Sequence, residues 1–109
     1  MLIFGYDPSR SGGVFTMQRT GVNDAEFMFY GWNSLVGRST PQLIEVKRGN
    51  HSDIRAAIAS KMASLIRESV REDDFLWDSR RLRRVMTLSA RIKDNAELEA
   101  FLRLEFEYL

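Results

Sequence analysis

The sequence predicts an α+β fold, in which a mainly antiparallel sheet of about five to six strands packs against one long helix. Three observations support this class. Apolar and aromatic runs separated by turn residues fill residues 1–50, which is typical of short strands. Apolar residues then recur with helical spacing over residues 52–72. Residues 85–108 alternate between apolar and polar side chains, which is the period of a half-buried strand.

Four strands are predicted before the helix. Residues 2–6 and 14–19 flank a loop dense in turn residues, so these two strands can pair as a hairpin. Residues 26–32 are strongly apolar and aromatic on both faces, which suits a central strand that is covered on both sides. Residues 43–47 make the fourth strand, and a Gly-Asn pair ends it.

One long helix is predicted over residues 52–72. Its apolar stripe recurs every four residues and consists of Ile54, Ile58, Met62, Ile66 and Val70. Most charged side chains of the segment fall off this stripe. Asn50 or Ser52 can serve as the N-cap, and Asp53 supplies negative charge to the first turn.

The end of the chain is predicted to be a long β-hairpin that turns at residues 94–96. This register places apolar residues opposite one another on one face and opposite charges on the other, which is favourable across strands. The charge pairs are Lys93 with Glu97, Arg91 with Glu99 and Arg83 with Glu107. The helix stripe would then cover the apolar face of the hairpin.

A helix is the competing interpretation for the same segment. Asp94 to Glu97 resembles a capping box, and the apolar residues that follow can line one helical face. The strand is preferred because a helix would scatter Leu104, Phe106 and Tyr108 around its surface and would lose the cross-strand charge pairs.

Size and composition limit the possible functions. The 109 residues predict a single α+β domain over 1–109, without linker or repeat. The absence of cysteine excludes disulfides, thiolate metal sites and a cysteine nucleophile, and a net charge of +1 excludes steering by the whole molecule. No apolar stretch is long enough for a signal peptide or a membrane span, so we expect a cytoplasmic protein without membrane contact. The size and composition suggest a bacterial or phage protein.

Residues 80–84 hold the sharpest local feature, a cluster of arginines. Arg80, Arg81, Arg83 and Arg84 can bind phosphates, and Trp77 just before them can stack on a base. The alternative is a solvated strand entrance, whose alternation would divide the arginines between two faces. Arg10, in the loop of residues 7–13, is a further candidate anion ligand, although that loop lacks the P-loop pattern.

Other residues indicate no specific chemistry. His51 is the single histidine and lies beside the predicted helix start, where capping explains its neighbours. The aromatic run suits a core or a subunit interface better than a ligand pocket. We therefore expect neither cofactor nor metal, and we do not expect an enzyme.

The predicted hairpin points to a protein interface. Phe101 interrupts the charged row on its outer face, where Arg103 and Glu105 are its neighbours, and these three residues are the candidate contacts. A terminal strand with an open edge invites strand addition or edge-to-edge pairing. We therefore expect a small soluble binding or adaptor protein that contacts a protein partner or itself, with a homodimer as one form. The alternatives are a nucleic-acid-binding protein that uses residues 80–84, and a small ligand-binding or enzymatic α+β barrel.

Overall fold

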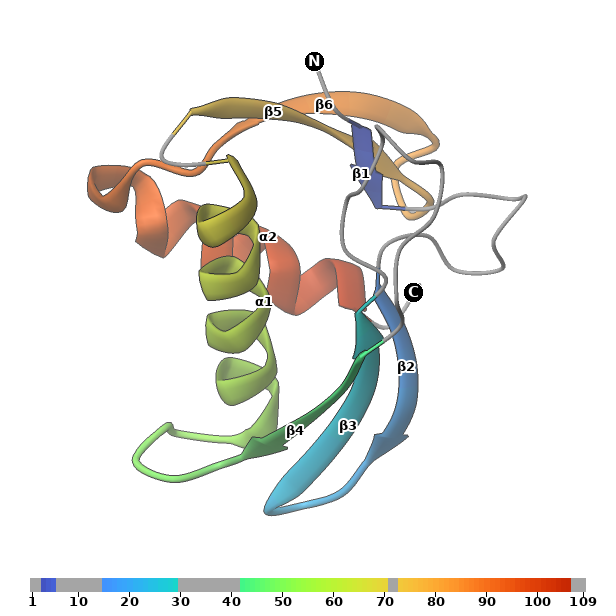
Figure 1. Cartoon of the computed structure of the whole chain (residues 1–109), viewed down its shortest axis with the longest axis vertical. Coiled ribbons are helices and arrows are strands. Elements are labelled where there is room, and N and C mark those ends of the chain that lie inside the picture. Colours follow the sequence, from blue (N-terminus) through green and yellow to red (C-terminus); the bar gives the residue numbers. More distant parts are fainter. Residues whose placement is uncertain (1–2, 6–14, 30–41, 71–72, 107–109) are drawn as a thin grey trace.

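The computed structural model of this chain describes residues 3–5, 15–29, 42–70 and 73–106 (Figure 1). In chain order its elements are β1 (Ile3–Gly5), β2 (Phe15–Thr20), β3 (Asp24–Phe29), β4 (Gln42–Lys47), α1 (Ile54–Val70), β5 (Asp74–Ser79), β6 (Arg84–Ser89), the 3-10 helix η1 (Ile92–Asp94) and α2 (Asn95–Glu105). The α+β class is therefore confirmed. The described strands form two separate three-stranded sheets instead of one, and a second α-helix follows them.

The first sheet has the antiparallel order β2-β3-β4. Its inner face carries the apolar residues of all three strands, and Phe15, Phe27 and Val46 are buried there. As predicted, the aromatic run supplies the central strand, because β3 pairs with β2 on one side and β4 on the other. Its residues 30–32 lie outside the described part of the chain.

The second sheet has the order β1-β5-β6, with β1 parallel to β5 and β6 antiparallel to β5. The predicted hairpin between residues 2–6 and 14–19 is therefore wrong, because β1 pairs with β5 and β2 pairs with β3. Residues 75–77 form the middle of β5. This strand alternates as a half-buried strand should, with Phe75, Trp77 and Ser79 facing the core.

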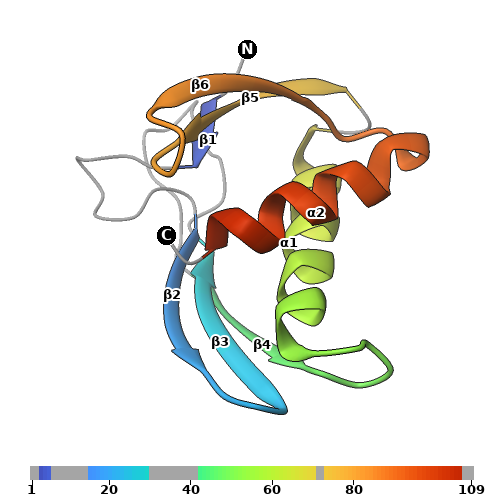
Figure 2. The ribbon, with the colours of Figure 1, turned by 180° about the vertical axis from the view of Figure 1, so that it is seen from behind.

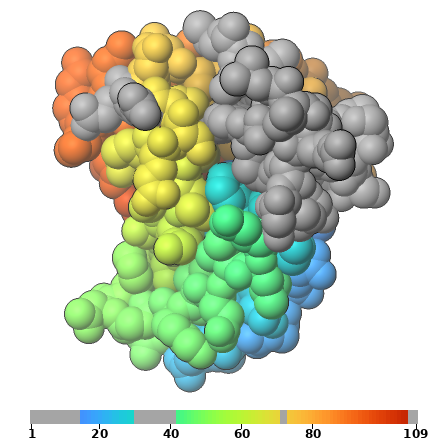
Figure 3. Space-filling model, viewed as in Figure 1, coloured from blue at the N-terminus to red at the C-terminus, as the bar shows by residue number. Residues whose placement is uncertain are grey.

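Helix α1 follows its predicted stripe. The residues buried along it are Ile54, Ala57, Ile58, Ala59, Met62, Ala63 and Ile66, and this side packs on β4 and β3. Its outer side forms a band on the surface next to β4 (Figure 3). Asp53, and not Asn50 or Ser52, caps the helix, because its Oδ1 accepts the Ala56 N–H at 2.8 Å. That hydrogen bond, with the nearby Arg103, lowers the pKa of the Asp53 carboxyl.

The predicted C-terminal hairpin is wrong, because residues 95–105 form helix α2. Leu98, Phe101, Leu102 and Glu105 follow the spacing i, i+3, i+4, i+7, so they share one helical face that turns toward the core. Burying this face outweighs the exposure of Leu104, which is 51% exposed. Of the charges predicted to pair, Glu107 lies outside the described residues, Arg83 lies in the turn between β5 and β6, and the others lie on η1, on α2 or just before η1.

Helix α2 crosses α1 (Figure 2) and is held there by arginine side chains. Arg55 of α1 donates to the carbonyl of Arg103 at 3.0 Å, and Arg103 donates to Asp53 Oδ2 at 3.1 Å. At the other end of α1, Arg67 donates to the carbonyl of Ala90 at 3.1 Å and to the side chain of Asn95. These bonds tie both ends of α2 to α1.

One core cluster joins the two sheets and both helices. Phe15 of the first sheet contacts aromatic rings of both sheets. The ring of Phe15 meets that of Phe27 edge-on at 5.4 Å, stacks on that of Phe29 at 5.4 Å, and lies 6.4 Å from that of Trp77 in the second sheet. Within the described chain, none of the helices is long and apolar enough to cross a membrane.

Candidate functional site

The arginine cluster lies at the tip of the β5–β6 hairpin. Residues 80–83 form the turn and Arg84 begins β6. The backbone of Arg83 is left-handed, with φ of 57°, which closes the turn. Arg80, Arg83 and Arg84 are exposed, whereas Arg81 is partly buried. The cluster is thus gathered at one tip, where the solvated alternative had predicted a division between two strand faces.

A buried carboxylate fixes this tip to α2. Glu105 is only 1% exposed, and it accepts hydrogen bonds from Trp77 Nε1 at 3.0 Å, Ser79 Oγ at 2.9 Å and Arg81 Nε at 2.8 Å. Ser79 Oγ in turn accepts the N–H of Leu82 in the turn at 3.0 Å. The donors of Trp77, Ser79 and Arg81 all point at the Glu105 carboxylate, and the Leu82 N–H points at Ser79. Because each of these polar groups is satisfied within the molecule, the Glu105 cluster is a structural anchor.

Phe101 completes the anchor. Its ring meets the Trp77 ring edge-on at 6.1 Å, and the Arg81 guanidinium lies 5.6 Å from its centre. An Arg81 cation that is paired with Glu105 and lies over an aromatic face is already engaged within the molecule. These contacts join helix α2 to the hairpin tip.

Several predicted site residues are thereby reassigned. Trp77 is 0% exposed, so it cannot stack on a nucleic-acid base. The predicted outer face of Phe101, Arg103 and Glu105 is wrong, because these residues contact Trp77, Asp53 and the hairpin tip instead. The alternation of apolar and polar residues near the end of the chain had predicted a strand, and this strand put all three residues on the wrong face. Arg10 lies outside the described residues.

The outer edge of β6 is unpaired within the described chain, because β6 ends its sheet. The Ala90 N–H donates to the carbonyl of Asp73 at 3.0 Å, which makes these two residues a hydrogen-bonded pair of the ladder. Such pairs alternate along an antiparallel ladder. The backbone groups of Leu88, Met86 and Arg84 therefore point toward β5, and those of the intervening edge residues point outward. We call these outward residues the β6 edge: Val85, Thr87 and Ser89.

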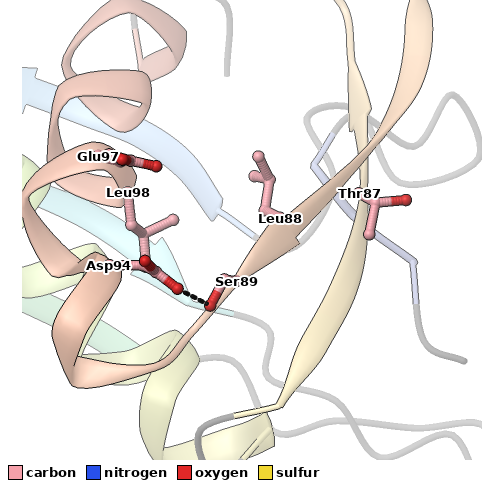
Figure 4. Close-up of a pocket in the computed structure, with 6 residues that line it drawn as sticks. All are labelled: Thr87, Leu88, Ser89, Asp94, Glu97 and Leu98. Atoms are coloured by element: carbon pink, nitrogen blue, oxygen red, sulfur yellow. Dashed lines mark hydrogen bonds between the residues drawn. The ribbon is translucent and has the colours of Figure 1, made fainter.

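A pocket opens beside this edge, between β6 and α2 (Figure 4). Its volume is about 240 Å³, and its lining consists of Thr87, Leu88, Ser89, Asp94, Glu97 and Leu98. Leu88 and Leu98 supply apolar walls from the two elements. Asp94 accepts a hydrogen bond from Ser89 Oγ at 2.7 Å, and Glu97 is exposed. The pocket thus combines an apolar wall with an acidic rim.

Charge is distributed unequally along the β6 edge. The exposed Arg83 and Arg84 lie at the start of the strand, and the acidic rim of Asp94 and Glu97 follows its end. The side chain of Arg84 lies along Met86 on the same face of the strand, with its Nε 3.2 Å from Sδ. One end of the edge is therefore cationic and the other anionic.

Other candidates yield no site. His51 is exposed, and no group of three metal-ligating side chains gathers in the part of the chain that the structure describes. Within the described part of the aromatic run, Phe27 is buried in the core. Comparison with family models, with curated proteins and with solved structures finds no match to this chain.

Proposed function

We propose that this chain is a small binding protein that takes up an extended segment of a protein by strand addition at the β6 edge. The observation that carries this proposal is the row of outward backbone groups at Val85, Thr87 and Ser89. An added strand gains affinity from such groups and specificity from neighbouring side-chain pockets. The pocket next to Leu88 supplies such a site.

The edge carries few of the features that protect natural edge strands. Val85 is 48% exposed and Thr87 is exposed, and neither is charged. Proteins usually blunt an exposed edge with proline, lysine or a bulge. The described register of β6 against β5 is regular over all six residues, without a bulge.

Proline at position 87 tests this proposal. Thr87 faces Leu76 in a non-hydrogen-bonded pair, so Thr87→Pro removes an outward N–H and no bond to β5. Decapeptides selected from a random displayed library for binding to the wild-type protein should bind Thr87→Pro at least roughly tenfold more weakly. Calorimetry on the selected peptides measures this difference.

Thr87→Val is the matched control, because it keeps both the N–H and the β-branched shape. It should bind the same peptides with unchanged affinity, and urea unfolding should show that both variants are folded. Peptides that bind Thr87→Pro as tightly as wild type would contradict strand addition at this edge.

A second candidate function rests on the hairpin tip. Arg80, Arg83 and Arg84 are exposed at one turn, and such a group can contact the phosphates of a nucleic acid without stacking by Trp77. In this function the tip would bind regardless of base sequence, since phosphate contacts do not distinguish bases.

Removal of two tip charges tests the second candidate. The double variant Arg83→Ala, Arg84→Ala should weaken binding to a labelled oligonucleotide and should lower the slope of log affinity against log salt by about two. The matched control removes two exposed lysines elsewhere, Lys61→Ala and Lys93→Ala. Equal losses in both double variants would show that only net charge matters.

A further inference from the structure

We infer that the segment added at the β6 edge is the β6 strand of a second copy, so that two chains form a dimer with a twofold axis at Thr87. This inference rests on the proposed strand addition and names its partner. In the dimer the sheets β1-β5-β6 of the two copies join into one continuous sheet.

The backbone of the edge fits an antiparallel copy of itself. With the axis at Thr87, Val85 faces Ser89 of the second copy and Thr87 faces Thr87. All three residues direct their backbone groups outward. Each facing pair then exchanges two N–H···O bonds, as a regular antiparallel ladder requires. A shift of one residue would place inward-facing groups at the junction, and a shift of two would leave one of the three outward residues of each edge without an outward partner. The axis at Thr87 is therefore the register that pairs all of them.

The same register fills the pocket. Residues that lie opposite each other share one face of a sheet, so Met86 of one copy meets Leu88 of the other at the wall of the pocket. Met86 is half-buried in the single chain and adapts readily to an irregular apolar space. The pocket beside Leu98 therefore receives an apolar side chain from the second copy.

Charge complementarity identifies a second copy as the partner. Arg84 lies two residues before Met86 on the same face, so in the dimer it reaches the rim that Asp94 and Glu97 form on the other copy. Because the arrangement is antiparallel, the cationic end of the β6 edge in each copy meets the anionic end in the other copy. The favourable contact therefore forms twice in the dimer. A parallel arrangement would instead bring arginines against arginines.

Reversing the charge at position 84 or at position 97 tests the dimer. Wild-type protein should show twice the chain mass of 12.6 kDa by light scattering over a dilution series. Arg84→Glu and Glu97→Lys should each weaken the dimer at least roughly tenfold, because each places like charges across the interface. Both positions are exposed, so both variants should fold.

Mixing provides the decisive readout. An equimolar mixture of Arg84→Glu and Glu97→Lys should restore the dimer as a heterodimer, in which Glu at 84 faces Lys at 97 and the native pair forms once. Failure of the mixture to regain the dimer mass would overturn the inference. So would a wild-type monomer at all concentrations, although peptides that bind wild type and not Thr87→Pro would then still support strand addition.

Discussion

Glu105→Ala should lower the free energy of unfolding by about 3 kcal/mol. The substitution leaves the Trp77 N–H and the Ser79 hydroxyl without their acceptor in the core, and it leaves the partly buried Arg81 without its counter-charge. Removing one partner of a buried ion pair costs more than the pair contributes, because the remaining groups stay desolvated. Urea unfolding followed by tryptophan fluorescence measures the change.

Two variants separate the anchor from a general effect of changing α2. Glu105→Gln keeps the shape and one acceptor oxygen, so it should cost less than Glu105→Ala. Leu104→Ala truncates an exposed side chain of the same helix, 51% exposed, and should change stability by no more than about 0.5 kcal/mol. If Glu105→Ala were as mild as Leu104→Ala, the carboxylate would not anchor the hairpin tip.

The N-terminal strands and α1 could be predicted from the sequence because their patterns have a single interpretation. The stripe from Ile54 to Ile66 fits a helix and no strand, and the turn residues around the first strands bound them closely. The partner of β1 could not be predicted in this way. It lies some seventy residues away in β5, and local patterns carry no information about such pairing.

The segment after residue 94 was ambiguous because two periods fit the same residues. Leu98 and Leu102 are apolar at a spacing of four, which satisfies a strand with period 2 and a helix with period 3.6 alike. Phe101 decides between them. It breaks the alternation expected of a strand but completes the helical face, and in the structure it packs on Trp77.

The anchor at Glu105 carried a weaker signal. A glutamate seven residues after Leu98 falls on the apolar face of a helix, and a charge on that face needs a buried partner. Arg81, Trp77 and Ser79 supply the required donors from the β5–β6 hairpin, which the sequence patterns did not predict. Recognising the buried carboxylate therefore depended on first assigning residues 95–105 to a helix.

Phe15→Ala should destabilise the fold by about 3–5 kcal/mol, because it opens a cavity where the two sheets meet. Phe15 is 0% exposed and contacts Phe27 and Phe29 in its own sheet and Trp77 in the other. Loss of the ring contact should also weaken the near-ultraviolet circular dichroism band of Trp77. Urea unfolding and circular dichroism measure the two effects.

Controls at the same and at a distant position make this prediction specific to the junction. Phe15→Leu fills much of the space and should cost about 1–1.5 kcal/mol, since apolar replacements of similar volume are tolerated best. Leu43→Ala removes a residue that is 57% exposed in the same sheet and should cost no more than about 0.5 kcal/mol. A Phe15→Ala variant as stable as Leu43→Ala would mean that the two sheets do not share one core.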